Sequence, residues 1–219
     1  QQEAPFERGV VATAEGVLGV IPESRFLGEP GDGVNEVKAL GHQLVLQHDF
    51  SDRWSLLTGV GYRDSSFEGF SSDAELAAGR QPYYSGTTRN VLLGRQRRYR
   101  EYSAKDLSAR AELSGRIETG SLTHHILTGV DYYDYELESL QNRVRFTLAG
   151  TYAINIFNPV YGQTAIPTAF VNTLENQKAT GIYVQDQMDL TEQWKLLVGV
   201  RYDTFDQDLR DLRGLSALQ

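Results

Sequence analysis

Histidines are the residues of this chain best suited to bind a metal ion. His124 and His125 are adjacent, while His42 and His48 stand apart from any cluster of carboxylates. Imidazole nitrogens bind metals well, but neighbouring residues of a β-strand point to opposite faces, so the adjacent pair cannot share one ion. The chain also contains no Cys. We therefore expect no metal or cofactor held directly by protein side chains.

The run RQRRYREY, residues 95–102, gathers the arginines that could attract an anion; they are Arg95, Arg97, Arg98 and Arg100. In one interpretation these cations bind an anionic ligand or membrane phosphates. In the other, which we favour, they form the solvated base of a loop. The whole chain has 21 basic and 29 acidic residues, a formal charge of −8. That balance argues against a nucleic-acid partner, whose phosphates need an excess of basic residues.

Motifs for enzymatic chemistry are missing from the sequence. It contains no Gly-x-Ser-x-Gly elbow, no Walker loop, no His-Glu-x-x-His and no dinucleotide fingerprint. Its carboxylates are spread along the chain rather than paired in a recognisable site. Without Cys, a thiol nucleophile, a thiolate metal site and a disulfide framework are excluded as well. We expect a protein that is not an enzyme.

The polar side chains that remain are carried by three similar stretches, at about 42–65, 107–136 and 181–205. Each is a strand-like run, a short polar turn and a second run, and the second runs share the phrases LLTGVGYRD, ILTGVDYYD and LLVGVRYD. In the last of them Leu196, Val198 and Val200 alternate with Lys195, Leu197, Gly199 and Arg201. A helix would scatter these apolar residues around its circumference, so the pattern predicts antiparallel hairpins.

The spacing of the hairpins favours a membrane β-barrel. The turns within them are short, whereas the connections at about 66–106 and 137–180 are long. Strands of roughly 10–13 residues suit a bilayer, which a tilted strand crosses in ~9–11 residues. Aromatic residues end the apolar face on both sides: Trp54 and Trp194 near the short turns, and Tyr62, Tyr132 and Tyr202 toward the long loops. Outer-membrane barrels have such girdles, while a soluble barrel explains only the alternation.

Several phrases resemble the TonB-dependent outer-membrane receptors, in particular their ferric-siderophore branch. They are SRFLGEPGDG, HDFSDRW, GSLTHHILTGVDYYDYE, INIFNPVYG and GIYVQDQMDLTEQWKLLVGVRYDTF, in the family's order from about residue 24 to 206. The resemblance implies an all-β fold, an antiparallel up-and-down meander that forms part of a transmembrane barrel with long extracellular loops. Residues 1–219 would be one piece of a single barrel domain, about six strands, and we expect the plug domain and the C-terminal strands to be absent from it.

The resemblance also implies a function and partners. The whole protein would import ferric siderophores across the outer membrane of a Gram-negative bacterium, with iron only as cargo. It would contact outer-membrane lipid, and the TonB energy-coupling complex through the missing N-terminal part. Two alternatives stay open: a passive porin-like channel and a soluble ligand-binding β-barrel. The porin would share the strands but not the receptor phrases, and the soluble barrel would need no girdle facing lipid.

Five residues on the face opposite the apolar one are candidates for contact with the ligand or the plug: Tyr133, Tyr183, Gln185, Arg201 and Asp203. For any one of them we favour the alternative, a wall residue hydrogen-bonded to the plug or to water. Four glycines share that face, namely Gly59, Gly61, Gly129 and Gly199. They either leave room for a plug or, as we favour, relieve strain in curved strands.

Aromatic residues in the long loops form a further candidate group: Tyr83, Tyr84, Tyr152, Phe157 and Tyr161. They could stack on a ligand, but we expect them mainly to fold the loops. Asp186 falls on the apolar face, where a carboxylate facing lipid is unfavourable near the middle of the membrane. It would need a position near the interface or a polar partner on the next strand.

Overall fold

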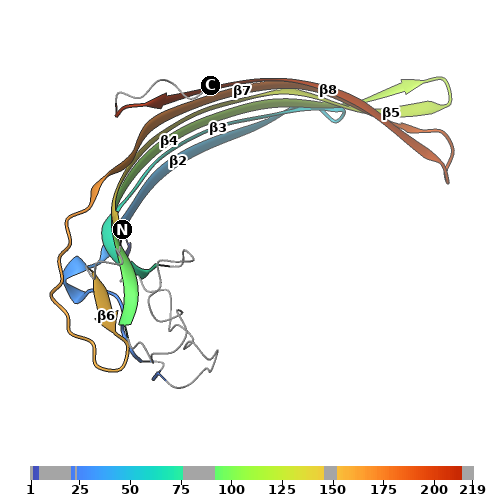
Figure 1. Cartoon of the computed structure of the whole chain (residues 1–219). Helices are drawn as coiled ribbons and strands as arrows, with labels where there is room; N and C mark the ends of the chain where they lie inside the picture. The colour runs from blue at the N-terminus through green and yellow to red at the C-terminus, as the bar shows by residue number, and fades with distance from the viewer. Residues whose placement is uncertain (1, 5–20, 23, 76–91, 146–151, 214–219) are drawn as a thin grey trace. The chain divides into compact units, whose positions relative to one another are not determined.

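The computed structural model describes residues 2–4, 21–22, 24–75, 92–145 and 152–213. Within them it contains one 3-10 turn, η1 (Pro30–Asp32), and long β-strands (Figure 1). The strands are β1 (Gln2–Ala4), β2 (Asn35–Ser51), β3 (Trp54–Ala74), β4 (Leu92–Thr119), β5 (Leu122–Arg145), β6 (Ala153–Asn155), β7 (Thr168–Asp189) and β8 (Lys195–Asp211). No helix in the described ranges is long and apolar enough to span a membrane.

The strands pair in the order β1-β2-β3-β4-β5-β7-β8, and β6 adds to β4. Apart from the short β6, neighbours in the sequence are thus neighbours in the sheet, which confirms the expected antiparallel meander. The chain divides into two compact units. Unit 1 comprises Gln1–Lys38, Ser66–Ser103 and Ser139–Thr173, and unit 2 comprises Ala39–Ser65, Ala104–Glu138 and Leu174–Gln219.

The predicted strands are too short. β3 continues to Ala74, β4 begins at Leu92, β5 continues to Arg145 and β7 begins at Thr168. The long strands therefore have 17–28 residues. Their outer parts, such as RQRRYREYSAKD on β4 and LENQKAT on β7, are rich in polar residues and lack the regular alternation that marks a strand in sequence. Backbone pairing extends there regardless of side-chain hydropathy, and the loops are correspondingly shorter.

Unit 2 is a sheet with two unlike faces. On β7 and β8 the even-numbered residues Ile182, Val184, Leu196, Val198 and Val200 are all exposed apolar side chains. At the short-turn end of this face Trp54 lies flat against Gly115, where an added Cβ would come within 2.6 Å of the indole Cη2 atom. Trp194, next to the β7–β8 turn, is 71% exposed. An exposed apolar band bordered by Trp is the surface that a lipid bilayer covers.

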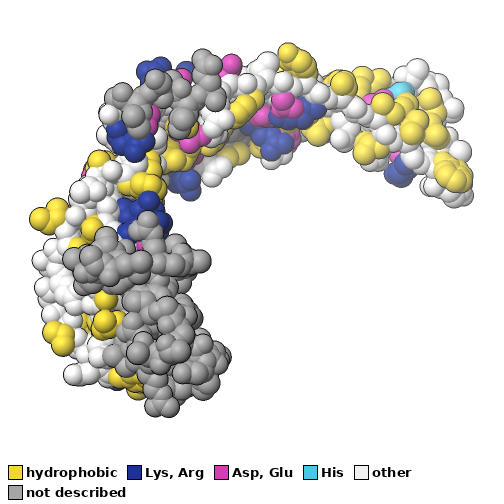
Figure 2. Space-filling model, in the orientation of Figure 1, with side chains coloured by type: hydrophobic (Ala, Val, Ile, Leu, Met, Phe, Trp, Pro, Cys, Tyr) yellow, Lys and Arg dark blue, Asp and Glu magenta, His cyan; other side chains and the backbone are white. Residues whose placement is uncertain are grey.

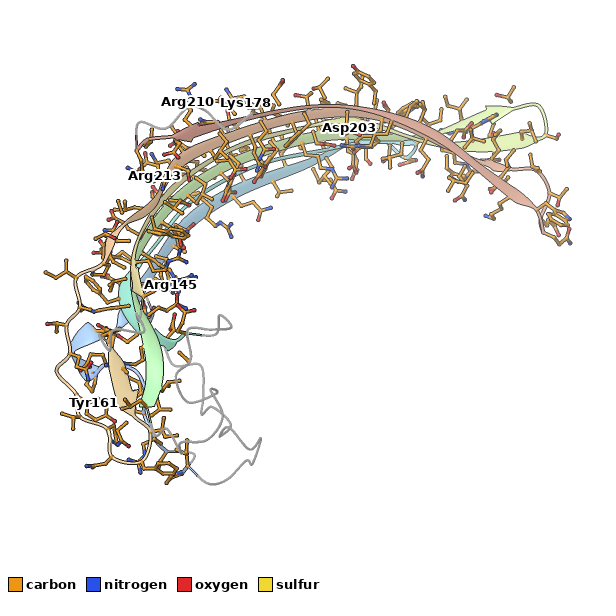
Figure 3. The ribbon with its side chains drawn as sticks, in the orientation of Figure 1. Arg145, Tyr161, Lys178, Asp203, Arg210 and Arg213 are labelled. Carbon is orange, nitrogen blue, oxygen red and sulfur yellow. The ribbon has the colours of Figure 1, made fainter. Side chains whose placement is uncertain are left out.

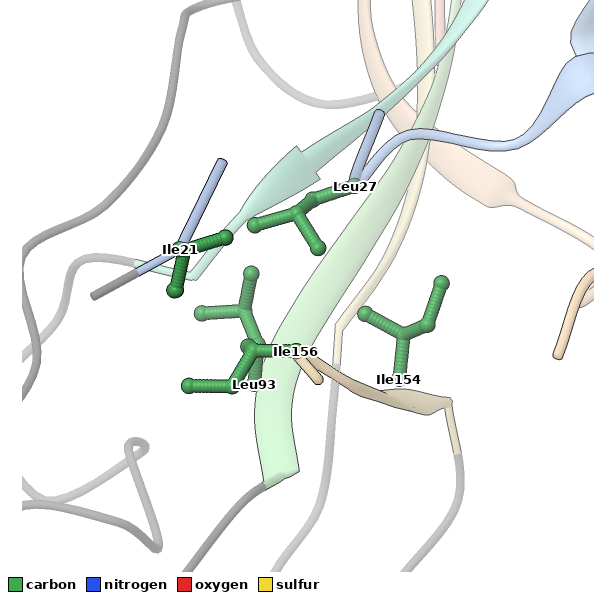
Figure 4. Close-up of a cluster of buried hydrophobic side chains, with 5 residues drawn as sticks. All are labelled: Ile21, Leu27, Leu93, Ile154 and Ile156. Atoms are coloured by element: carbon green, nitrogen blue, oxygen red, sulfur yellow. The ribbon is translucent and has the colours of Figure 1, made fainter. Parts of the chain in front are cut away.

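Unit 1 has a small apolar core of Ile21, Leu27, Leu93, Ile154 and Ile156 (Figure 4). Beside it lie the arginines of the 95–102 run, and both expectations for them are wrong. Arg95, with a side chain 0% exposed, donates to Gly28 O at 2.7 Å and pairs with Glu29 at 3.3 Å. Arg97 pairs with Asp32 at 2.7 Å.

The third buried arginine of the run, Arg100, pairs with Asp73 at 3.4 Å. Acidic partners 27–66 residues away in the chain therefore pair with the run, and it is neither a solvated loop base nor a free anion site. Burial of such pairs demands this complete partnering.

Candidate functional site

A cluster of six side chains occupies the polar face of unit 2 and is here called the wall cluster: Arg110 and Glu112 on β4, Asp131 on β5, Tyr183 on β7, and Arg201 and Asp203 on β8. Tyr183 is at its centre. The phenol donates to Glu112 Oε2 at 2.6 Å and accepts a bond from Arg110 Nη2 at 3.4 Å. The Arg201 guanidinium lies 5.4 Å from the centre of the ring, a cation–π distance.

Arg201 joins two strands through its guanidinium. Its Nη1 and Nη2 donate to the two oxygens of Asp131 at 2.8 and 2.9 Å, a bidentate pair. Its Nε donates to Asp203 at 2.9 Å and its Nη2 to the same carboxylate at 2.6 Å. Bidentate guanidinium–carboxylate pairs fix orientation as well as charge. Most of the donors of Arg201 are therefore engaged, while the side chains of Asp131 and Asp203 stay 38% and 55% exposed.

Glycines give these large side chains the space to lie against the sheet. A Cβ at Gly129 would come 2.6 Å from Tyr183 Oη, and one at Gly181 would come 2.7 Å from Arg201 Cζ. At Gly199 the nearest atoms, Val184 O and Gln185 Cβ, would be 3.3 and 3.4 Å away. The space over Gly129 is thus filled by a neighbouring side chain. From the sequence, the glycines were expected either to leave room for a plug or to relieve strain in curved strands. Close packing by a neighbouring side chain was not among these interpretations.

The structure brings three of the five predicted site residues together, namely Tyr183, Arg201 and Asp203. Gln185 lies further along the same face, beside Gly199, and Tyr133 stacks on Tyr135 with ring centres 6.0 Å apart. The sequence reasoning missed Arg110, Glu112 and Asp131 as members of the cluster. Alternation placed these residues on the polar face, but only the register between strands shows which of them meet.

The two histidines have separate acidic partners. His124 Nδ1 lies 2.7 Å from Asp186 Oδ2, and His125 Nε2 lies 3.1 Å from Asp189 Oδ2. Asp186 lies on the apolar face, where its carboxylate requires a polar partner. His124 on the neighbouring strand β5 is that partner. In the part of the chain that the structure describes, no three His, Cys, Asp or Glu side chains gather as metal ligands.

The loop aromatics of unit 1 mainly stabilise the loop. Tyr152 is buried with a φ of 71°, its ring lies 4.6 Å from Arg95 Cζ, and its hydroxyl contacts Ser72. Burial raises the pKa of the Tyr152 phenol. Tyr161, labelled in Figure 3, donates to Phe26 O at 2.7 Å. Phe157 is exposed, and Tyr83 and Tyr84 lie outside the described residues.

The overall chemistry of unit 2 is that of a barrel wall. One face is exposed and apolar, and the other carries acids and bases in contact, visible as adjacent blue and magenta side chains in Figure 2. Long antiparallel strands with an apolar face toward lipid and a polar face toward a lumen define an outer-membrane β-barrel protein.

Comparison of the sequence with protein families assigns the chain. Residues 5–217 match the family described as TonB dependent receptor-like, beta-barrel. The chain belongs to this family of outer-membrane receptors, whose members are transporters and not enzymes.

Two curated relatives are named as receptors. The Metal-pseudopaline receptor CntO of Pseudomonas aeruginosa is 35% identical over 210 residues, which are 95% of this chain and 28% of that protein. The Ferrioxamine B receptor of Salmonella typhimurium is 34% identical over 93 residues, 42% of this chain and 12% of that receptor. The chain thus spans less than a third of the length of these relatives.

Solved structures share the fold. The closed form of the ferric-catecholate import receptor Fiu from Escherichia coli K12 superposes with a TM-score of 0.75 at 17% identity, over 95% of this chain and 31% of Fiu. The siderophore receptor PiuA of Acinetobacter baumannii superposes with a TM-score of 0.71 at 16% identity, over 88% of this chain and 29% of PiuA. At these identities the likeness concerns the fold alone.

Proposed function

We propose that the protein containing this chain imports a metal chelate, a ferric siderophore in the first instance, across the outer membrane. The observation that carries the proposal is the 35% identity to a metal-pseudopaline receptor along 95% of the chain. A second relative named for ferrioxamine B supports a chelated metal as cargo. Residues 1–219 are then one piece of the barrel wall, and the plug and the remaining strands belong to other parts of the protein.

The wall cluster fits a role in holding the cargo or the plug. Its residues face the lumen, carry both charges and are fixed in orientation by bidentate bonds. Arg201 pairs with Asp203 and lies 5.4 Å from the centre of the Tyr183 ring, and Gln185 and Tyr133 extend the same polar face toward the two ends of the strands. In this account extracellular loops and lumen capture the chelate, and energy delivered through TonB rearranges the plug. No covalent bond is made or broken.

The test is uptake of iron by cells that express the complete receptor. Iron-starved cells with the gene, cells with the gene deleted and cells without TonB receive ⁵⁵Fe-loaded siderophores one at a time. We expect saturable uptake of at least one complex that requires both the receptor and TonB. Uptake that rises linearly with concentration and persists without TonB would instead identify a passive channel.

An antibody to this segment should detect an outer-membrane band several times heavier than 24.5 kDa, stronger without iron.

A further inference from the structure

Two loop segments of unit 1 lie against the start of β4. Residues 24–33, which precede β2, are here called the leading segment, and residues 152–165, which follow β5, are called the return loop. Within the return loop, β6 pairs with residues 92–94 at the edge of β4. Arg95 N donates to Tyr152 O at 3.0 Å, and the Arg95 guanidinium lies 4.6 Å from the centre of the Tyr152 ring. The return loop therefore begins as part of the sheet.

Two buried arginines of β4 each join the leading segment to the return loop. Arg95, already in contact with the return loop, pairs with Glu29 of the leading segment at 3.3 Å. Arg97 donates to Asp32 of the leading segment at 2.7 Å and to Ala165 O of the return loop at 3.0 Å. Both arginine side chains are buried. Water therefore competes little for these bonds, and each is stronger than it would be at the surface.

The carboxylate of Glu29 bonds the two segments directly. Its Oε1 accepts a bond from Gly162 N at 2.7 Å, and its Oε2 accepts one from Gln163 N at 3.3 Å. The φ of Gly162 is 94°, a conformation that favours glycine, so this turn is matched to its sequence. Beside it, Tyr161 donates to Phe26 O at 2.7 Å, and the two rings lie with their centres 6.3 Å apart.

Apolar burial adds to these polar contacts. Ile154 and Ile156 of the return loop are 1% and 4% exposed, and they share a core with Leu27 of the leading segment and Leu93 of β4 (Figure 4). Segments that move in function generally have few buried apolar contacts and many hydrogen bonds exposed to solvent. The return loop has the opposite properties.

We infer that Arg95, Arg97 and Glu29 latch the return loop, so that it is a fixed part of the receptor and does not close over the cargo. The statement about cargo rests on the proposed function, whereas the latch itself does not. Movement of the return loop would expose Ile154 and Ile156 and would remove two amide donors from Glu29. A ligand can drive such a change only through an equally large difference in its affinity for the two positions.

The test measures how often the return loop opens in the complete receptor in outer-membrane vesicles, with any other Cys replaced by Ser. In an Ile156→Cys receptor the thiol lies in the core and reacts with a maleimide only when the loop opens. The matched control is Val160→Cys in the same loop, because the side chain of Val160 is 67% exposed. We expect Ile156→Cys to react at least about tenfold more slowly than Val160→Cys.

Variants of the latch locate the effect. Arg97→Met removes the bonds to both segments and should make Ile156→Cys react about tenfold faster, the effect of losing hydrogen bonds to a charged group. The control Lys38→Met breaks a surface pair with Glu36 in the same unit and should leave the rate unchanged. If Arg97→Met does not fold, Arg97→Lys serves instead. It keeps the charge but lacks the guanidinium fork, so it should also accelerate the reaction.

Two measurements with cargo decide whether the return loop moves. The Ile156→Cys receptor is labelled with and without a saturating ferric complex of a linear trihydroxamate, and then of a tricatecholate. We expect equal rates. In cells, the pair Phe26→Cys and Tyr161→Cys is joined by a short thiol crosslinker that reduction cleaves. The crosslinked receptor should import ⁵⁵Fe-loaded siderophore as fast as the reduced one.

The outcomes separate this inference from the proposed function. Equal reaction rates of Ile156→Cys and Val160→Cys, or a rate that Arg97→Met leaves unchanged, overturn the latch. A rate that changes when cargo binds, or a crosslink that reversibly stops uptake, overturns the fixed position of the loop and leaves metal-chelate uptake standing. If no ferric complex binds and no ⁵⁵Fe is taken up, the proposed function fails, and the labelling rates still decide whether the latch exists.

Discussion

Replacing Gly129 with Ala should destabilise the barrel, because the space over this glycine is occupied by Tyr183. The new Cβ would lie 2.6 Å from the phenol oxygen, 2.7 Å from Cζ and 2.8 Å from the backbone oxygen of Ala111. Van der Waals contact needs ~3.5 Å or more. Tyr183 would have to leave the sheet, and its bond to Glu112 at 2.6 Å would break. Overpacking of this kind costs about 1–3 kcal/mol, and a lost bond to a charged group about 1.5–3 kcal/mol.

We therefore expect Gly129→Ala to lower the free energy of unfolding by about 2.5–6 kcal/mol. The matched control is Gly199→Ala, on the same face, whose Cβ would meet its nearest atoms at 3.3–3.5 Å. That substitution should change stability by less than about 1 kcal/mol.

The assay is urea unfolding of the complete receptor in lipid vesicles, followed by Trp fluorescence and by the mobility shift of folded barrels on unheated gels. A Tyr183→Phe variant provides a second comparison, since it removes only the phenol oxygen nearest to the new Cβ. In that background Gly129→Ala should be less destabilising. Equal stability of the Gly129→Ala and Gly199→Ala receptors would refute the packing argument, as would a Gly129→Ala receptor as stable as the wild type.

Three further predictions concern the buried pairs and the loop tyrosine of unit 1 and the histidine pair of unit 2. Arg95→Met leaves Glu29 buried without its cation, so urea unfolding should show a loss of about 3–5 kcal/mol. Burial raises the pKa of Tyr152 above its ordinary value of 10.0, so the protonated phenol is favoured in the folded state. The contribution of the neutral Tyr152 phenol to the free energy of unfolding is thus complete below pH 10.0 and is lost as the pH rises above it. Between pH 8 and 11, the urea midpoint should therefore fall less steeply with pH in Tyr152→Phe than in the wild type. Asp186→Leu and His124→Leu each break a pair on the apolar face and should destabilise the barrel in vesicles, whereas the double variant should recover most of the loss. Additive losses in the double variant would contradict the pairing.

The sequence was sufficient to predict the hairpins and the two faces. Side chains of a strand alternate by geometry, so runs such as 194–202 reveal which residues share a face. The three similar stretches also predicted the meander, since hairpins joined in order pair in order. What alternation cannot reveal is the register between strands. Asp131 and Arg201 are 70 residues apart, and nothing in either run shows that they meet.

The outer parts of the strands and the arginine run were mispredicted for a related reason. Charged residues such as Arg95 and Arg97 are normally solvated, so a run of them favours a loop. In the structure their partners Glu29 and Asp32 come from a distant segment, and the pairing allows burial within β4. A local pattern contains no information on such partners.

The central claim is that this chain is a barrel wall with one face toward lipid and the other toward the lumen. Residues 1–219 contain no Cys, so single cysteines at positions 195–203 can carry spin labels in outer-membrane vesicles once any Cys elsewhere in the complete receptor is replaced by Ser. Collisions with molecular oxygen, which concentrates in lipid, should peak at the even positions 196, 198, 200 and 202 and fall at the odd positions. Uniform collision rates along β8, or peaks at 197, 199 and 201, would contradict the assignment of the two faces.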